Sequence, residues 1–126
     1  MNIKNTFKKF ILLNIGLFFL LFTSVFLESD EVIRFNESLD AIPTSLLIIS
    51  LIWMISYFVS LYFLYTFKKN GKKLFSILFV LGVVLNLPLG PSAVDSLMYT
   101  IDALSWCSQS AILVFLYFTP VQKYFK

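Results

Sequence analysis

The chain has 126 residues, of which 59% are hydrophobic and 13% charged, and its formal net charge is +3. Charged residues are about half as frequent as in an average soluble domain, and a domain of this size has too little interior to bury so much apolar surface. The composition therefore excludes an ordinary soluble domain. It predicts one integral membrane domain, residues 1–126, with a few spans and the lipid bilayer as its first partner.

Four apolar segments follow one another along this domain. A membrane-spanning helix needs about 20 mostly apolar residues, and segments without polar–apolar alternation favour helices over barrel strands. The segments predict helices over residues 10–27, 46–67, 74–94 and 97–119. The third is long enough only if it continues through residues 90–94. Short connections make successive helices antiparallel neighbours, so the expected fold class is all-α, an integral membrane four-helix bundle.

The first segment also allows a second interpretation. Lys8 and Lys9 before an apolar stretch are typical of a secretory signal peptide. The apolar stretch runs for 18 residues, longer than the roughly 7–15 of a signal-peptide core, and no small-residue cleavage pattern precedes Glu28. We therefore expect this segment to be kept as the first helix.

The connections between the helices alternate in charge. The two terminal segments and the loop 68–73 carry nine lysines and no acid, whereas the opposite side carries the seven acids and Arg34. Because lysine-rich short loops stay in the cytoplasm, we expect both termini and the loop 68–73 inside, and the loop 28–45 outside. The loop lysines are interpreted mainly as a topology signal, with binding of anionic lipid headgroups as the alternative. They are Lys68, Lys69, Lys72 and Lys73.

Local signals mark the joints. Asn70-Gly71 predicts the turn between the second and third helices, and Ser92 or Asp95 is expected to cap the fourth. Apolar residues among the acids of the loop 28–45 predict a short helix on the membrane surface.

The chain offers little for catalysis. It has no histidine, the commonest general base and metal ligand. Its one cysteine, Cys107, allows neither an internal disulfide nor a cysteine-rich metal site. No phosphate loop, dinucleotide fingerprint or nucleophile elbow is present. We therefore predict a protein that is not an enzyme and uses no metal or cofactor. No folded basic surface is expected to present the lysines to a nucleic acid.

Polar residues interrupt the last apolar segment. Helical spacing places Asp102, Ser105 and Gln109 on one face of it. Asp102 has three open interpretations: an interfacial or capping residue, a hydrogen-bond partner of Asn86 in the third helix, or a functional carboxylate that binds a proton or a cation.

Other polar residues are interpreted as contacts between helices. Gln109 is expected near mid-membrane, where Ser56 or Ser60 of the second helix reaches its depth. Asn14 is expected close to the inner edge of the first helix. Trp53 and Trp106 are interpreted as packing residues.

Small residues recur every fourth position in two of the predicted helices. They are Ala103, Cys107 and Ala111 in the fourth helix, and Gly82, Asn86 and Gly90 in the third. Such ridges let helices approach closely in lipid, so we expect another helix to press on each. Cys107 is interpreted as chosen for its size.

The last helix and its tail read LYFTPVQKYFK, residues 116–126. With the order of acidic and basic connections, this segment resembles the YdgK-like four-helix bacterial inner-membrane proteins of unknown function. Their last helix ends in an aromatic, a serine-rich step, then Val-Lys and another aromatic. The matching residues here are Tyr117, Phe118, Val121, Lys123 and Phe125. The resemblance implies a bacterial inner membrane and no particular activity.

Size and composition are also similar to those of membrane-embedded immunity proteins against pore-forming bacteriocins. That resemblance implies contact with the helices of a toxin inside the bilayer. The leading hypothesis is thus a small protein that works through helix contacts with a membrane partner or a second copy of itself. The alternative is a small transporter or channel subunit that uses the Asp102 and Gln109 face. A transport role places Asp102 in a water-filled cavity, whereas a contact role places it in packing or at the lipid edge.

Overall fold

The structure is a computed structural model that describes residues 2–39, 41–89 and 92–126. Within these ranges the chain forms helices and no strands. The elements in chain order are α1 (Ile3–Ser24), η1 (Val25–Leu27), α2 (Asp30–Glu37), α3 (Thr44–Tyr65), α4 (Lys69–Asn86), η2 (Leu87–Leu89), α5 (Ser96–Phe118) and η3 (Pro120–Tyr124). The predicted all-helical class is confirmed.

Three of the described helices are long and apolar enough to cross a membrane. They are α1 with η1 (Ile3–Leu27), α3 and α5. The fourth long helix, α4, begins with lysines. Its apolar part, residues 74–86, is about 20 Å long at about 1.5 Å per residue, against about 30 Å of hydrocarbon in a bilayer. By length and composition, three helices therefore fit membrane spans and α4 is shorter, which is compatible with a helical membrane protein.

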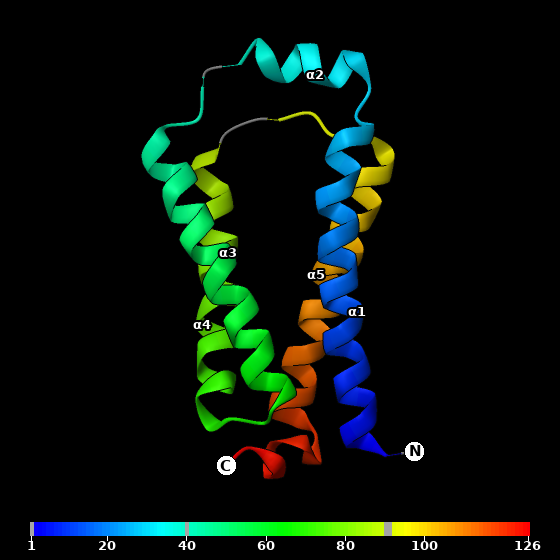
Figure 1. The fold of residues 1–126 in the computed structure, drawn as a ribbon, viewed down its shortest axis with the longest axis vertical. Helices are drawn as coiled ribbons and strands as arrows, with labels where there is room; N and C mark the ends of the chain where they lie inside the picture. The colour runs from blue at the N-terminus through cyan, green and yellow to red at the C-terminus, as the bar shows by residue number, and fades with distance from the viewer. Residues whose placement is uncertain (1, 40, 90–91) are drawn as a thin grey trace.

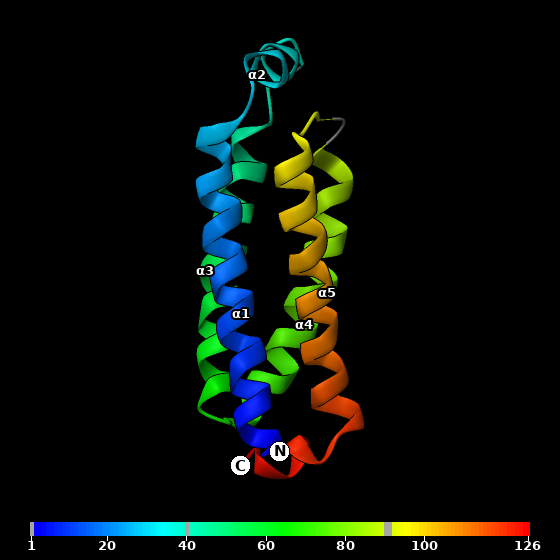
Figure 2. The ribbon, with the colours of Figure 1, turned by 90° about the vertical axis from the view of Figure 1, so that its right-hand side faces the viewer.

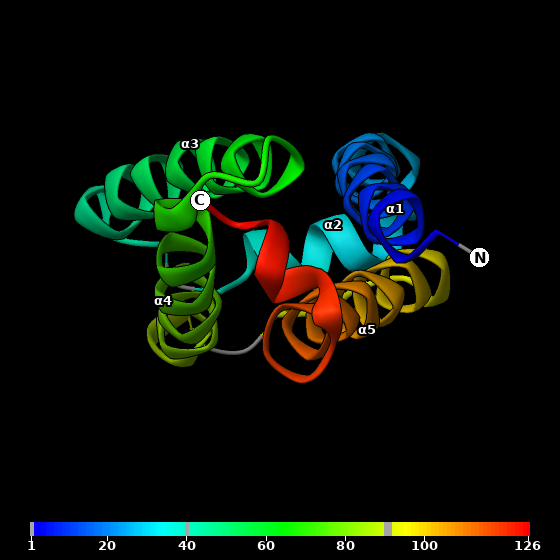
Figure 3. The ribbon, with the colours of Figure 1, turned by 90° about the horizontal axis from the view of Figure 1, so that it is seen from below.

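The four long helices form two antiparallel pairs. α1 packs along α5, and α3 packs along α4 (Figures 1 and 3). The pairs converge at the end where both chain termini lie and diverge toward α2, which crosses the opposite end (Figures 1 and 2). The sequence predicted that helices consecutive in the chain would be neighbours. In the structure α1 pairs with α5, which are the first and the last long helices of the chain.

The converging end holds the hydrophobic core. Phe7 of α1 is fully buried, and its ring lies 5.8 Å from that of Phe67 and 6.0 Å from that of Phe115. Beneath the pairs, η3 brings Val121 into the same core. The tail is then tied to the α3–α4 joint, because the Lys126 carbonyl accepts from the Lys69 N–H at 2.9 Å.

The diverging end is held by a clasp of hydrogen bonds between the two outer connections. The Asp95 carboxylate accepts from the N–H of Ser29 at 2.7 Å and from its hydroxyl at 3.0 Å. The Asn36 side chain pairs with the backbone of Ala93, donating at 3.0 Å and accepting at 2.9 Å. Asp95 occupies the N-cap position of α5, as predicted, but its side chain bonds to the other connection.

The predicted range 74–94 is wrong at both ends. α4 begins at Lys69, because lysine is a good helix former and its side chain can reach water from a helix in lipid. It ends at Asn86, before Pro88, and residues 92–95 are not helical. Gly90 lies outside the described residues.

The predicted turn at Asn70-Gly71 is also wrong, because α4 begins before these two residues. Both residues lie in the first turn of α4, and the chain reverses at residues 66–68, where Phe67 has a φ of 56°. Glycine at position 71 serves packing, because a Cβ there would stand 2.8 Å from Cβ of Phe63.

The other predicted ranges need smaller changes. The first helix starts at Ile3, ahead of the predicted range 10–27, because its lysines are helical as well. The predicted ranges 46–67 and 97–119 become Thr44–Tyr65 and Ser96–Phe118. The short helix expected in the loop 28–45 is α2, and residue 40 of this loop lies outside the described part of the chain.

Candidate functional site

A buried polar contact joins three helices where the two pairs begin to diverge. Asn14 of α1 is 1% exposed, and its Oδ1 accepts from the hydroxyl of Tyr57 in α3 at 2.5 Å. Its Nδ2 donates to the backbone carbonyl of Ser105 in α5 at 3.5 Å. Both ends of this amide are therefore satisfied away from water, as buried polar groups require. Asn14 thus lies in the interior of the molecule, where it joins three helices. Its place near the inner edge of the membrane stays a prediction.

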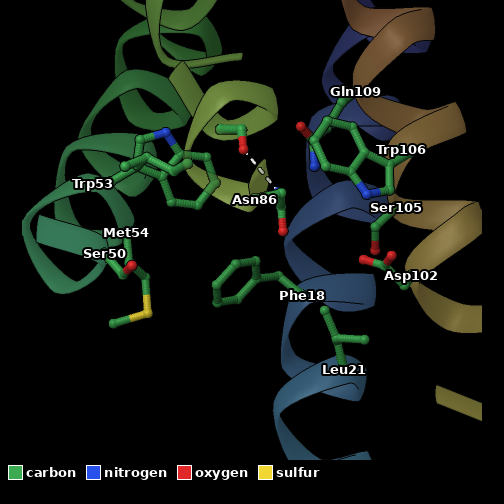
Figure 4. A pocket seen from close by; sticks show the side chains of 12 residues that line it. Phe18, Leu21, Ser50, Trp53, Met54, Asn86, Asp102, Ser105, Trp106 and Gln109 are labelled. Atoms are coloured by element: carbon green, nitrogen blue, oxygen red, sulfur yellow. Dashed lines mark hydrogen bonds between the residues drawn. The ribbon is translucent and has the colours of Figure 1, made fainter. Parts of the chain in front are cut away.

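A cavity of about 280 Å³ lies next to this contact, toward the α2 end (Figure 4). All four long helices line it, so it forms only where the two helix pairs come together. The lining residues are Phe18, Leu21, Ser50, Trp53, Met54, Gly82, Leu85, Asn86, Asp102, Ser105, Trp106 and Gln109.

The α5 wall of the cavity is polar. Asp102, Ser105 and Gln109 lie along it together with Trp106 (Figure 4). The spacing of three and four residues puts them on one helix face, so the face predicted from sequence is the one turned inward. Gln109 is 8% exposed, and the buried Oγ of Ser105 has no hydrogen-bond partner among the described residues.

The opposite wall comes from α3 and α4. Nδ2 of Asn86 donates to the Gly82 carbonyl at 2.8 Å, which leaves its Oδ1 on the cavity side (Figure 4). Nε1 of Trp53 donates to the Leu78 carbonyl at 2.8 Å. Gly82 fits closely against this indole, since a Cβ there would stand 2.7 Å from Cζ2 of Trp53. The expected packing role of Gly82 is therefore visible, with a tryptophan ring as its neighbour.

The structure decides among several predicted contacts of Asp102 and Gln109. Asp102 is not a cap, because α5 begins at Ser96 with Asp95 as its N-cap residue. Asp102 and Asn86 line the same cavity, but the Asn86 amide bonds within its own helix.

The predicted partners of Gln109 are wrong. The Ser56 hydroxyl donates to the Ile52 carbonyl at 2.8 Å, and that of Ser60 donates to the Tyr57 carbonyl at 2.6 Å. Serine hydroxyls in helices commonly bond back to a preceding turn, so depth in the membrane alone does not pair them with Gln109.

The predicted ridge on α5 faces away from the other helices. Ala103 and Cys107 are exposed and Ala111 is half-buried, whereas Ser105 and Ser108 are 5% exposed. The small residues that turn toward the other helices are therefore the serines Ser105 and Ser108. The hydroxyls of Ser105 and Ser108 are buried without a hydrogen-bond partner among the described residues, whereas the exposed Ser110 hydroxyl donates to the Trp106 carbonyl.

The predicted lysines gather at the converging end. Lys68, Lys69 and Lys73 are exposed, and Lys72 places its Nζ 4.1 Å from the centre of the Tyr117 ring. From α1, Lys8 lies 4.2 Å from the ring of Tyr65. Ammonium groups over aromatic faces are electrostatically favourable, so this end is basic outside and aromatic beneath.

Comparison with protein-family models, curated proteins and solved structures finds no match to this chain. Within the described residues, no group of three or more His, Cys, Asp or Glu side chains stands ready to hold a metal ion. The cavity is thus the feature of the described structure with the clearest chemical character.

Proposed function

We propose that this chain is a non-enzymatic multi-pass membrane protein that binds a small solute in the cavity between its helix pairs, as a small transporter or channel subunit does. One observation carries this proposal: Asp102, Gln109 and Asn86 line a single cavity although they come from opposite helix pairs. A protein that works only by helix contact would gain from filling this space with apolar side chains. An ionisable group facing a cavity at membrane depth is by default a site for a solute.

The charge distribution supports a defined orientation. The nine lysines lie at or near the end with both termini, and the α2 connection at the other end is rich in acids (Figure 1). By the positive-inside rule, we propose that both termini are cytoplasmic and that the membrane is the bacterial inner membrane. α4 is proposed as a fourth crossing, because it returns the chain between two helices that run the same way (Figure 1). Its lysines extend its reach to the interface.

A second candidate function is contact with a membrane partner, including an immunity-like one. The observation that favours it is the exposed face with Ala103 and Cys107 on α5, where a helix of a second copy or another protein can approach closely. The two candidates are compatible, because four helices form a narrow bundle and a continuous path through it would need a second copy. Nucleic acid is not proposed as a partner.

Water access to the cavity tests the leading proposal. Cys107→Ser removes the one cysteine, and Ser50→Cys then places a single thiol at the α3 wall of the cavity. A charged, membrane-impermeant methanethiosulfonate should label Ser50→Cys in purified protein and in membranes. The matched control is Ser60→Cys on the same helix, whose side chain is 0% exposed in the core, and it should stay unlabelled. Equal protection of both thiols would mean a dry cavity and would overturn the proposal.

A further inference from the structure

We infer that the cavity binds a small organic cation with a primary ammonium group and an apolar body. This inference rests on the proposed function, which makes the cavity a ligand site, and it adds the chemical class of the ligand. It follows from the charge of the cavity, from its free hydrogen-bonding atoms and from its aromatic lining.

The cavity holds an acid and no base among its described lining residues. Asp102 is the charged residue among the described residues that line it, and the lining holds no lysine or arginine. The carboxylate is half-buried in a setting of apolar and aromatic side chains. A carboxylate partly withdrawn from water is stabilised in its ionised form by a nearby positive charge. The described lining residues do not supply one, whereas a cationic ligand would.

The cavity offers acceptors for a donor-rich ligand. Two donors of the wall already bind backbone carbonyls, since the Asn86 amide binds Gly82 and the Trp53 indole N–H binds Leu78. The acceptors that line the cavity include the Asp102 carboxylate and Oδ1 of Asn86, with the unpartnered hydroxyl of Ser105 beside them, and the Gln109 amide and the Trp106 indole N–H add donors to the lining (Figure 4). A primary ammonium carries three N–H donors and no acceptor. It matches this set, whereas a quaternary ammonium would leave the acceptors unsatisfied.

The rest of the lining suits an apolar body. Trp53, Trp106 and Phe18 supply aromatic surface, with aliphatic side chains beside them. Indole rings attract cations most strongly among the aromatic side chains. Trp53 is held in place by Tyr57, with ring centres 5.2 Å apart and planes 16° from parallel, so its surface is fixed before any ligand arrives.

The size of the cavity separates an organic cation from a metal ion. Its volume of about 280 Å³ equals roughly nine water molecules at about 30 Å³ each. That space is larger than one ion needs and close to the lower end of the range of ligand pockets, about 300 Å³. A Ca²⁺ or Mg²⁺ ion would require about six or more oxygen ligands, and the lining supplies a single carboxylate, that of Asp102.

The two tryptophans of the chain allow a direct binding test. Both Trp53 and Trp106 line the cavity, so intrinsic tryptophan fluorescence reports on its contents. Purified protein in detergent is titrated with n-hexylammonium chloride, and in parallel with n-hexanol, hexyltrimethylammonium and sodium chloride. We expect a saturable change with n-hexylammonium, a weaker one with the quaternary ion, and only non-saturating or negligible changes with the alcohol and the salt.

Substitutions then locate the binding. Asp102→Asn should raise the Kd for n-hexylammonium about tenfold or more, as expected for a hydrogen bond to a charged group. Asp102→Glu should retain binding. Glu31→Gln removes one acid from exposed α2 and should leave the Kd unchanged. If Asp102→Asn fails to fold, Asn86→Leu provides the test on the opposite wall, with a Kd several times higher.

The outcomes distinguish this inference from the proposed function. Labelling of Ser50→Cys without saturable n-hexylammonium binding would overturn the cation inference and leave the cavity as a site for another solute. Equal responses to n-hexylammonium and n-hexanol, unchanged by Asp102→Asn, would mean simple partition into detergent and would also overturn the inference. An unlabelled Ser50→Cys would overturn both.

Discussion

The two ends of the molecule are built from the same four long helices, yet one end is packed and the other holds a cavity. At the end with the termini, large side chains such as Phe7, Phe75 and Leu64 are fully buried and the helix pairs meet. Toward α2 the cavity lies between the pairs, lined by small or polar residues such as Ser50, Gly82 and Ser105 and by large ones such as Trp53 and Trp106. Large side chains therefore occur at both ends, but only at the end with the termini do those of the two pairs pack together. The packed end and the outer clasp together hold the cavity open.

The largest expected effect comes from breaking the packed end. Phe7→Ala removes a fully buried ring that contacts three other aromatic rings. Loss of a buried phenylalanine typically lowers the free energy of unfolding by about 3–5 kcal/mol. Thermal unfolding in detergent should show a strong loss. Phe22→Ala is the control on the same helix, because Phe22 is 60% exposed and its loss should change stability little. Equal losses would mean that the packed end is not the stabilising region.

The next effect tests the α3–α4 wall of the cavity at the hollow end. Gly82→Ala would place a Cβ 2.7 Å from the Trp53 ring. Overpacking of this kind costs about 1–3 kcal/mol, and the forced movement of Trp53 should shift its fluorescence. Gly16→Ala is the matched control, since a Cβ at Gly16 meets nothing within 4 Å. It should be neutral or slightly stabilising. An unchanged fluorescence spectrum in Gly82→Ala would contradict the close fit.

A smaller effect is expected at the contact that separates the packed end from the cavity. Tyr57→Phe removes the hydroxyl that donates to Asn14 and leaves a buried acceptor without its partner. Such a loss costs about 1–3 kcal/mol, and in membranes the measured values lie near the lower end. Unfolding should therefore begin at a modestly lower temperature. Tyr65→Phe, which alters an exposed tyrosine, should leave the unfolding temperature unchanged. A Tyr57→Phe variant as stable as the wild type would mean that this hydrogen bond does not stabilise the protein.

Much of the fold could be predicted from the sequence, because hydropathy and charge are local properties. The apolar runs located the four long helices, and the lysines and acids separate along the long axis as expected. The start of α4 was missed because hydropathy values do not register that the stem of a lysine side chain can lie along an apolar helix. The pairing of α1 with α5 was missed because it depends on contacts between the ends of the chain.

The candidate site could be predicted in part. The face with Asp102, Ser105 and Gln109 was found because helical spacing alone defines it. The partners of Gln109 and the contacts of Asn14 with Tyr57 and Ser105 were not, because depth along a helix does not reveal how the neighbouring helix is rotated. The prediction that another helix packs on the ridge of Ala103 and Cys107 was wrong, because both residues are exposed. A small residue tolerates either face of a helix, so its spacing alone does not say which face turns inward.

The smallest expected effect concerns the outer clasp, and it asks whether the two ends respond independently. Asn36→Ala removes both hydrogen bonds between this side chain and the backbone of Ala93. Each partly exposed bond contributes at most about 1 kcal/mol, so global unfolding should change little. The Ala93 amide, which donates to Asn36 at 2.9 Å, should exchange its hydrogen faster. The Lys126 amide, bonded to the Phe67 carbonyl at the packed end, should keep its exchange rate. Faster exchange at both amides would mean that the clasp and the core open as one unit, and that the contrast between a packed and a hollow end does not extend to their motions.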